Sequence, residues 1–158
     1  MNTAPRPIQN IFDAMAIRAV RNECNEFMTH DPSKIGILRQ LNWYFRNYRP
    51  SQENKKLVCY LFWKENSATP IGYGVIRFND KKYWLTGGII QKERGKGFGK
   101  ILFQKLIERT PSNEVWLDVL ETNQIAYRLY KKLGFRKIRQ SKNEQDKNII
   151  IMSLRKNS

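Results

Sequence analysis

The sequence predicts an α/β (α+β) fold with a mixed, mostly antiparallel central sheet of six to seven strands flanked by about four helices. Three observations support this. Two stretches with helically spaced apolar residues precede residue 50, β-favouring runs separated by turn residues fill 57–90, and helix-like and strand-like segments alternate thereafter. The chain has 158 residues, and one of that size buries about 70% of its unfolded surface around a single core. We therefore expect one domain, 1–158.

Two helices are expected before residue 50. The first, Asp13–Met28, has apolar side chains mostly three or four residues apart, Asp13 as its N-cap and Pro32 beyond its end. The second, Ile35–Tyr48, is expected to end at Pro50, because the helical conformation is disfavoured before a proline. Its many aromatic side chains either pack in the core or line a binding pocket, and a buried face is the favoured interpretation.

Three antiparallel strands are expected next, over residues 57–63, 71–78 and 82–90. Gly87 and Gly88 lie inside the third. A glycine pair within a strand marks a bulge or a place where another group approaches the backbone closely.

The later elements are expected to be a helix, a strand, a helix and a strand pair. Their predicted ranges are 99–109, 115–120, 123–133, 135–139 and 148–154. Gly134 is placed as the left-handed C-cap of the second of these helices.

The chain is strongly basic. It has 29 Lys and Arg against 14 Asp and Glu, a formal net charge of +15. We therefore expect an anionic partner, although a field of this sign attracts a nucleotide cofactor, a nucleic acid and an anionic membrane surface alike.

Several classes of protein are excluded or disfavoured. His30 is the only histidine, so a two-histidine metal site is impossible and no metal is expected. Cys24 and Cys59 lack CxxC spacing, which favours buried free thiols and a cytoplasmic location over a disulfide framework. Neither an apolar N-terminal segment nor a run of about eighteen apolar residues is present, so we expect no secretion and no membrane span.

The segment from Arg94 to Lys100 lies between a predicted strand and a predicted helix, with glycines at 95, 97 and 99. Glycines permit positive φ and close approach of a ligand, and the N–H groups of a helix N-terminus bind anions. The pattern predicts a pyrophosphate cradle. It is neither a P-loop, because Ile101 follows Lys100, nor a dinucleotide fingerprint, because Lys100 stands where a third glycine is needed.

Arg94, Gly97 and Gly99 form the pattern R-x-x-G-x-G, which resembles motif A of the GCN5-related N-acetyltransferase (GNAT) superfamily. About thirty residues later, the pattern N-x-x-A-x-x-L-Y-x-x-x-G-F resembles motif B of the same family. It is formed by Asn123, Ala126, Leu129, Tyr130, Gly134 and Phe135. The resemblance covers about Gly72 to Leu154. It implies a GNAT-like fold and an N-acetyltransferase that uses acetyl-CoA, with an acetyl-CoA-binding core in 57–154 and acceptor-side helices in 8–50.

The resemblance also implies roles for individual residues. The backbone of the strand before the loop would pair with the pantetheine arm of the cofactor, at Gly88, Ile89, Ile90 and Gln91. Loop N–H groups would hold the diphosphate, from Arg94, Gly95, Lys96, Gly97, Phe98, Gly99 and Lys100, with added contacts from the Arg94, Lys96 and Lys100 side chains. Asn123 resembles the cofactor-contacting asparagine, and Tyr130 the general acid near the thioester sulfur.

The family reaction is direct attack of an amine on the thioester within a ternary complex, with a backbone amide near Ile89 facing the developing oxyanion. The resemblance does not identify the group that accepts the proton of the amine. Many relatives carry a glutamate on the strand before the loop, but residues 83–88 contain none. Asp118 and Glu121 are the candidate bases, and a chain of water molecules is an equal alternative.

Three functions follow. The first is acetylation of a primary amine on a small molecule, such as an amino sugar or amino acid; polyamines fit worst, because a protein of charge +15 repels cations. The second is acetylation of an amine attached to RNA, or of a ribosomal or other protein amine. The third is a non-catalytic module that binds CoA or nucleic acid. The acceptor and the oligomeric state, a dimer among the options, are not determined by the sequence.

Overall fold

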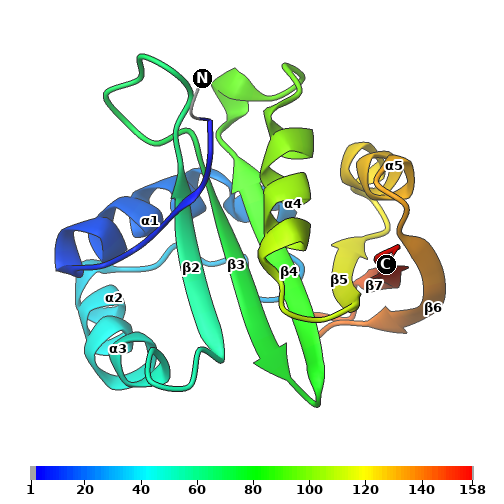
Figure 1. The fold of residues 1–158 in the computed structure, drawn as a ribbon, viewed down its shortest axis with the longest axis horizontal. Helices are drawn as coiled ribbons and strands as arrows, with labels where there is room; N and C mark the ends of the chain where they lie inside the picture. The colour runs from blue at the N-terminus through cyan, green and yellow to red at the C-terminus, as the bar shows by residue number, and fades with distance from the viewer. Residues whose placement is uncertain (1–2, 158) are drawn as a thin grey trace.

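The computed structural model describes residues 3–157. Seven strands form one sheet in the order β1-β2-β3-β4-β5-β7-β6 (Figure 1). The strands are β1 Arg6–Pro7, β2 Leu57–Phe62, β3 Gly72–Asn79, β4 Lys82–Ile89, β5 Glu114–Leu120, β6 Arg136–Lys142 and β7 Asn148–Arg155. All neighbours pair antiparallel except β4 and β5, which are parallel. The predicted mixed, mostly antiparallel sheet is confirmed; only the short edge strand β1 was missed.

The helices flank this sheet. They are α1 Ile11–Glu23, α2 Ile37–Trp43, α3 Arg49–Ser51, α4 Phe98–Arg109 and α5 Gln124–Lys132, with 3-10 turns at Asn25–Phe27 and Gln91–Glu93 and a π-helical turn at Tyr44–Tyr48. No helix within residues 3–157 is long and apolar enough to cross a membrane. Cys24 and Cys59 are buried free thiols, as predicted.

Helix α1 begins earlier than predicted. Asn10 is the N-cap, and its Oδ1 accepts a hydrogen bond of 2.9 Å from the N–H of Asp13. The Asp13 carboxylate in turn accepts from the N–H of Gln9 at 2.9 Å. Asp13 is therefore the reciprocal partner in a capping arrangement rather than the cap itself. The helix ends at Glu23, after which the chain tightens into the 3-10 turn.

The prediction that the second helix ends at Pro50 is wrong. The helical path runs from α2 through the π-helical turn into α3, which contains Pro50. Arg49 N–H donates to the carbonyl of Tyr44, five residues earlier. A proline lacks a donor and crowds the carbonyl four residues before it, and a wider turn relieves that crowding. Tyr44 and Tyr48 are buried, which confirms the core interpretation for these two aromatic residues.

Helices α1 and α4 pack on opposite faces of the central strands (Figure 1). Gly87 and Gly88, which are adjacent in β4, show how closely the two helices approach the sheet. A Cβ on Gly87 would lie 3.3 Å from Leu102 of α4, and a Cβ on Gly88 would lie 3.1 Å from the sulfur of Cys24. The glycine pair thus marks close approach on both faces.

The sheet opens between β4 and β5. Their parallel pairing comprises Tyr83 with Val115 and Trp84 with Trp116. Beyond that point β4 continues to Ile89 paired with β3, and β5 continues to Leu120 paired with β7. The two strands therefore diverge toward the end of β4, where the glycine-rich loop begins.

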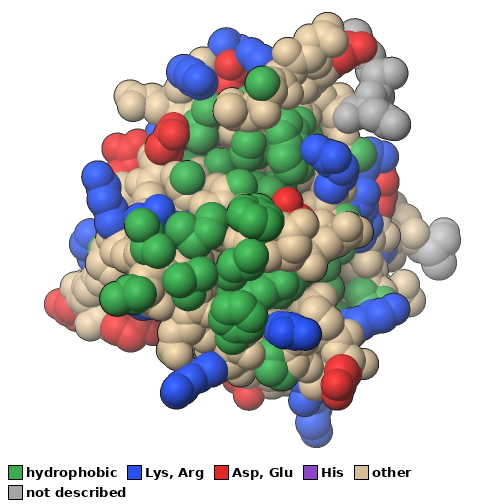
Figure 2. Space-filling model, turned by 90° about the vertical axis from the view of Figure 1, so that its left-hand side faces the viewer, with side chains coloured by type: hydrophobic (Ala, Val, Ile, Leu, Met, Phe, Trp, Pro, Cys, Tyr) green, Lys and Arg blue, Asp and Glu red, His purple; other side chains and the backbone are tan. Residues whose placement is uncertain are grey.

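A broad apolar surface lies on the α1–α2 side of the molecule (Figure 2). Phe12 and Leu38 are each 81% exposed, and Ile37 and Phe45 are 55% and 52% exposed. The apolar side chains of these helices are therefore only partly buried in the core.

The positive φ of Gly134 gives a test of the fold. Gly134 has φ +101°, and a Cβ there would lie 2.9 Å from Cδ1 of Leu154. We expect Gly134→Ala to lower the free energy of unfolding by about 1–2 kcal/mol, because an L-residue is strained in this conformation. Urea unfolding of the ligand-free protein measures it. The control is Gly99→Ala, where a Cβ meets only an ordinary contact; equal losses in both variants would contradict the argument.

Candidate functional site

The loop between β4 and α4 has the backbone that its glycines predicted. Gly95 has φ +75° and Gly97, the N-cap of α4, has φ +87°. A Cβ at either position would meet nothing within 4 Å. The glycines are therefore needed for their dihedral angles, and the side of the loop that they face is open.

The backbone donors of this loop are free. From Gly95 to Lys100, no N–H group donates to an acceptor within residues 3–157, and the first bonded donor is Ile101 N–H, to Gly97 O at 3.3 Å. Successive free donors at the positive end of a helix bind an anion. The residues present fit a diphosphate.

The buried carboxylate of Glu93 holds the loop through two ion pairs. The Glu93 side chain is 7% exposed and forms ion pairs with Lys64 at 2.6 Å and Lys96 at 3.0 Å. These hydrogen bonds, first that of Lys64 and then that of Lys96, lower the pKa of Glu93. Sequence reasoning missed this role of Glu93, because its partner Lys64 lies on a distant segment.

The basic side chains of the loop differ in what they contact. The Arg94 guanidinium donates to Ile89 O at 2.8 Å and to Glu26 at 2.7 Å, and Lys96 is bound to Glu93. Lys100 is exposed and forms no ion pair with the residues described. Two of the three cations therefore hold the loop in shape, and Lys100 is available to an external anion.

The edge of β4 presents backbone groups to the opening. Ile90 N–H donates to Ile71 O at 2.9 Å, so the alternation of an antiparallel ladder turns the N–H and C=O of Gly88 toward β3 and those of Ile89 toward β5. No β5 partner faces Ile89, since that pairing ends at Trp84. Of the backbone groups predicted to meet the pantetheine arm, only the N–H of Ile89 thus lies on the open edge, because its C=O accepts from Arg94. Gly88 faces β3, Ile90 N–H donates to Ile71 just before β3, and Gln91 begins the 3-10 turn.

Helix α5 places Tyr130 beside the same opening. Asn123 is its N-cap, with Oδ1 accepting from Ala126 N–H at 3.3 Å. Tyr130 is 8% exposed and packs between Phe103 and Phe135, with ring centroids 4.9 and 6.0 Å away.

The hydroxyl of Tyr130 is free to act on a ligand. It has no hydrogen-bond partner within residues 3–157, where the only fully buried, unpartnered side-chain N or O atom is Trp116 Nε1. The Tyr130 hydroxyl is therefore unpartnered and keeps slight contact with solvent, although the side chain is buried. Burial, and then the neighbouring Tyr73 and Asp118, raise the pKa of Tyr130, so it is a neutral proton donor.

The two candidate bases occupy different environments. Asp118 on β5 is 19% exposed; its Oδ2 lies 2.8 Å from His30 Nε2, and its Oδ1 has no partner within the described residues. Both oxygens of Glu121 instead accept amide hydrogen bonds, from Gln140 at 2.8 Å and Asn148 at 2.9 Å. Asp118 is thus the carboxylate with a free oxygen. Sequence reasoning missed His30 as its partner; the only signal was that His30 is the sole histidine.

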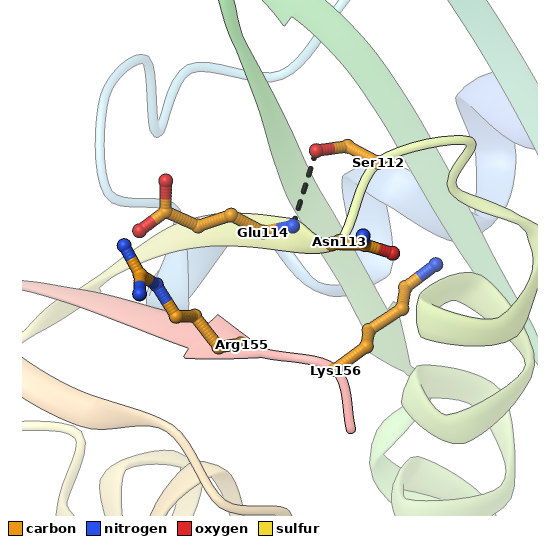
Figure 3. Close-up of a pocket in the computed structure, with 5 residues that line it drawn as sticks. All are labelled: Ser112, Asn113, Glu114, Arg155 and Lys156. Atoms are coloured by element: carbon orange, nitrogen blue, oxygen red, sulfur yellow. Dashed lines mark hydrogen bonds between the residues drawn. The ribbon is translucent and has the colours of Figure 1, made fainter. Parts of the chain in front are cut away.

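Two surface hollows lie outside this opening. One of about 300 Å³ is at the start of β5 and the end of β7, where Ser112 Oγ accepts from Glu114 N–H at 3.1 Å (Figure 3). It is remote from the loop, because β4 begins at that end of the sheet. The other, of about 340 Å³, lies between α4 and α5 with Lys100 and Lys132 in its lining. It adjoins the loop.

The sequence matches the family described as Acetyltransferase (GNAT) family over residues 17–135. The chain belongs to this family. As a GNAT protein it is an N-acetyltransferase with acetyl-CoA as its cofactor, which confirms the predicted family, enzyme class and cofactor. A search of curated proteins finds no match.

Solved structures share the GNAT fold along nearly the whole chain. The Salmonella typhimurium protein yncA, solved with its cofactor acetyl-CoA, is 18% identical with a TM-score of 0.73, covering 98% of this chain and 95% of that one. Spermidine N-acetyltransferase from Vibrio cholerae, in complex with CoA and spermine, is 15% identical with a TM-score of 0.80, covering 97% and 95%. Ribosomal-protein-alanine N-acetyltransferase from Brucella melitensis is 15% identical with a TM-score of 0.74, covering 96% and 98%. At these identities the likeness shows the fold.

Lys100 allows a test of the loop as an anion site. We expect Lys100→Gln to raise the Kd for acetyl-CoA about fivefold at low salt, and less at high salt, because an exposed charge contributes about 1 kcal/mol and is screened. Isothermal titration calorimetry measures it. Lys105→Gln on the same helix is the matched control, since Lys105 pairs with Glu108 at 2.9 Å; equal Kd values for the two variants would argue against the assignment.

Proposed function

We propose that this GNAT enzyme acetylates the primary amine of a small molecule by direct attack within a ternary complex. The opening between β4 and β5 carries the proposal, because it has free backbone donors at the loop end and Tyr130 and Asp118 at its side. We infer that residues 1–158 form one domain, in which 57–154 bind the cofactor and 8–50 contribute the acceptor side.

The chain's own groups provide cofactor binding. The N–H groups from Gly95 to Lys100 receive the diphosphate, and Lys100 adds a cation at their end. The N–H of Ile89, on the open edge of β4, would be available to donate to the reacting carbonyl. Asn123 acts by fixing the start of α5. Acetyl-CoA supplies an acetyl group activated as a thioester.

The two proton transfers fall to Asp118 and Tyr130. As the N–C bond forms, Asp118 Oδ1 takes the proton that the amine loses, directly or through a water molecule. With acetyl-CoA bound, the Tyr130 hydroxyl would be the group that gives a proton to the released thiolate. The raised pKa of Tyr130 keeps the phenol protonated at neutral pH, so its proton is present for the transfer. Glu121, held by two amides, anchors the β6–β7 end.

A second acceptor class is favoured by one observation. The cations of α5 and β6 and of the turn that follows are exposed, and within residues 3–157 the only ion pair among them is Lys142 with Asp146. They are Arg128, Lys131, Lys132, Arg136, Lys137, Arg139, Lys142 and Lys147. This surface supports an acceptor amine attached to RNA, or on the ribosome. Steep loss of activity with salt would favour that class over a small amine.

The proposal is tested by thermal stabilisation and then by turnover. Acetyl-CoA at a hundred times its Kd should stabilise the protein by about 2.7 kcal/mol, and unrelated nucleotides should not. Release of free thiol with a panel of amines then identifies the acceptor. If RNA stabilises the protein, acetyl-CoA does not and no amine supports thiol release, the proposal is overturned.

Tyr130→Phe separates chemistry from binding. We expect kcat to fall about a hundredfold or more, because the general acid is lost, while the Kd for acetyl-CoA changes less than about twofold. Steady-state kinetics and calorimetry measure the two values. Tyr127→Phe on the same helix is the matched control. A Tyr130→Phe enzyme with unchanged kcat would exclude the hydroxyl as the acid.

A further inference from the structure

A segment that follows α1 crosses to the far side of the opening. We call residues Met28–Ser33 the strap. At its start the Tyr73 hydroxyl donates to Met28 Sδ at 3.2 Å, and at its end Arg21 of α1 donates to the carbonyls of Asp31 and Ser33. Between these points Asn143, in the β6–β7 turn, donates to Thr29 O at 2.6 Å. The strap therefore joins the helical layer to the strands beyond the opening.

His30 lies at the centre of the strap, between two carboxylates. Its Nε2 is 2.8 Å from Asp118 Oδ2, and its Nδ1 is 3.0 Å from Glu144 Oε2. A carboxylate only accepts hydrogen bonds, and a neutral imidazole carries one N–H. Two carboxylates on the two ring nitrogens therefore require both nitrogens to be protonated. The geometry is that of an imidazolium bridging two anions.

The surroundings of the ring are consistent with this charge. Asp118 from β5 and Glu144 from the β6–β7 turn are the charged groups that face it. The neighbouring Asp31 carboxylate is turned away, bound to Arg39 at 2.7 Å and to Ser33. Partial burial lowers the pKa of His30, but the hydrogen bonds with Glu144 and Asp118 outweigh it, and the pKa is raised above the ordinary 6.5.

We propose that His30 is a positioning residue for acetyl transfer: as an imidazolium it ties Asp118 to Glu144, holds the strap across the acceptor side of the opening, and leaves Asp118 Oδ1 free for the amine. This rests on the proposed function, since it gives Asp118 its task. His30 itself does not take the proton, because both of its nitrogens are already protonated. Its effect is on the orientation of the carboxylate and on access of water.

The bridge that His30 forms between Asp118 and Glu144 stabilises the protein only over a range of pH. A raised pKa in the folded state means that the bridge stabilises the protein fully below pH 6.5 and less as pH rises through the folded-state pKa of His30. At the acid end, the hydrogen bond with His30 lowers the pKa of Glu144, so that contribution is present above 4.5 and is lost as pH falls through the lowered value. The bridge is complete between these two limits.

The first experiment observes the ring directly. His30 is the only histidine, so in untagged protein its imidazole signals in ¹⁵N and ¹³C NMR need no assignment. We expect both nitrogens to be protonated at pH 6.5, a titration midpoint above that of a free histidine, and a downward shift of the midpoint in Glu144→Gln. Asp146→Asn in the same turn is the matched control, because Asp146 pairs with Lys142. A midpoint at or below 6.5 would overturn the proposal.

The second experiment asks whether the bridge matters for turnover. His30→Gln keeps a hydrogen-bonding side chain but cannot be an imidazolium. The ratio of wild-type to variant kcat/KM for the acceptor should be about tenfold at pH 6.5 and approach one at high pH, where wild-type His30 is neutral. Taking the ratio cancels ionisation of the amine itself. A merely structural contact would give a ratio independent of pH, and that result would refute a positioning role.

The outcomes separate this inference from the proposed function. The KM for acetyl-CoA and its thermal stabilisation should be unchanged in His30→Gln, because the hydrogen bonds of the His30 ring go to Asp118 and Glu144 and none goes to the loop. If wild-type protein binds acetyl-CoA but acetylates no amine, the proposed function fails even where the NMR midpoint is raised. If it acetylates an amine and His30 titrates normally, only the positioning role fails.

Discussion

The functional site depends on the divergence of β4 from β5 beyond Trp84 and Trp116. Parallel strands that stayed paired would satisfy each other's backbone groups, and the edge of β4 would be closed. Because they separate, the N–H of Ile89 faces an opening, and Tyr130 and Asp118 lie beside it from α5 and β5. The remaining sheet tolerates this, since β4 keeps its pairing with β3 and β5 keeps its pairing with β7.

Charge in the cofactor loop has two separate uses. The successive free N–H donors of the loop need a fixed conformation to face one anion together, and Arg94 and Lys96 help to hold it through ion pairs with Glu26 and Glu93. The backbone and Lys100 are then left for the anion. Much of the local positive charge is therefore structural, and the net charge of +15 overstates what the loop itself offers to a ligand.

The N-terminal region is tied into the site as well as into the core. The end of α1 approaches β4 so closely that a Cβ on Gly88 would lie only 3.1 Å from the sulfur of Cys24. From the end of α1 the strap reaches Asp118 and the β6–β7 turn through His30 and Asn143. The acceptor side is thus assembled from segments at both ends of the chain, and its geometry depends on both.

Features set by neighbouring residues followed from the sequence. The loop glycines and the left-handed Gly134 each depend on dihedral angles within a few residues, so their spacing predicted them. The capping of α5 by Asn123 is equally local, but it was not predicted, since Asn123 was expected to contact the cofactor. The family motifs belong to the same local class, and they were sufficient for the fold and the cofactor. The passage of helix through Pro50 was not predicted, because the proline was expected to end the helix, whereas a π-helical turn relieves its crowding of the preceding carbonyl. The partners of Asp118 could not be predicted either: His30 is 88 positions from Asp118 and 114 from Glu144. Only the folded chain brings such groups within hydrogen-bonding distance, because their meeting is determined by sheet order and strand divergence, which no short stretch of sequence encodes.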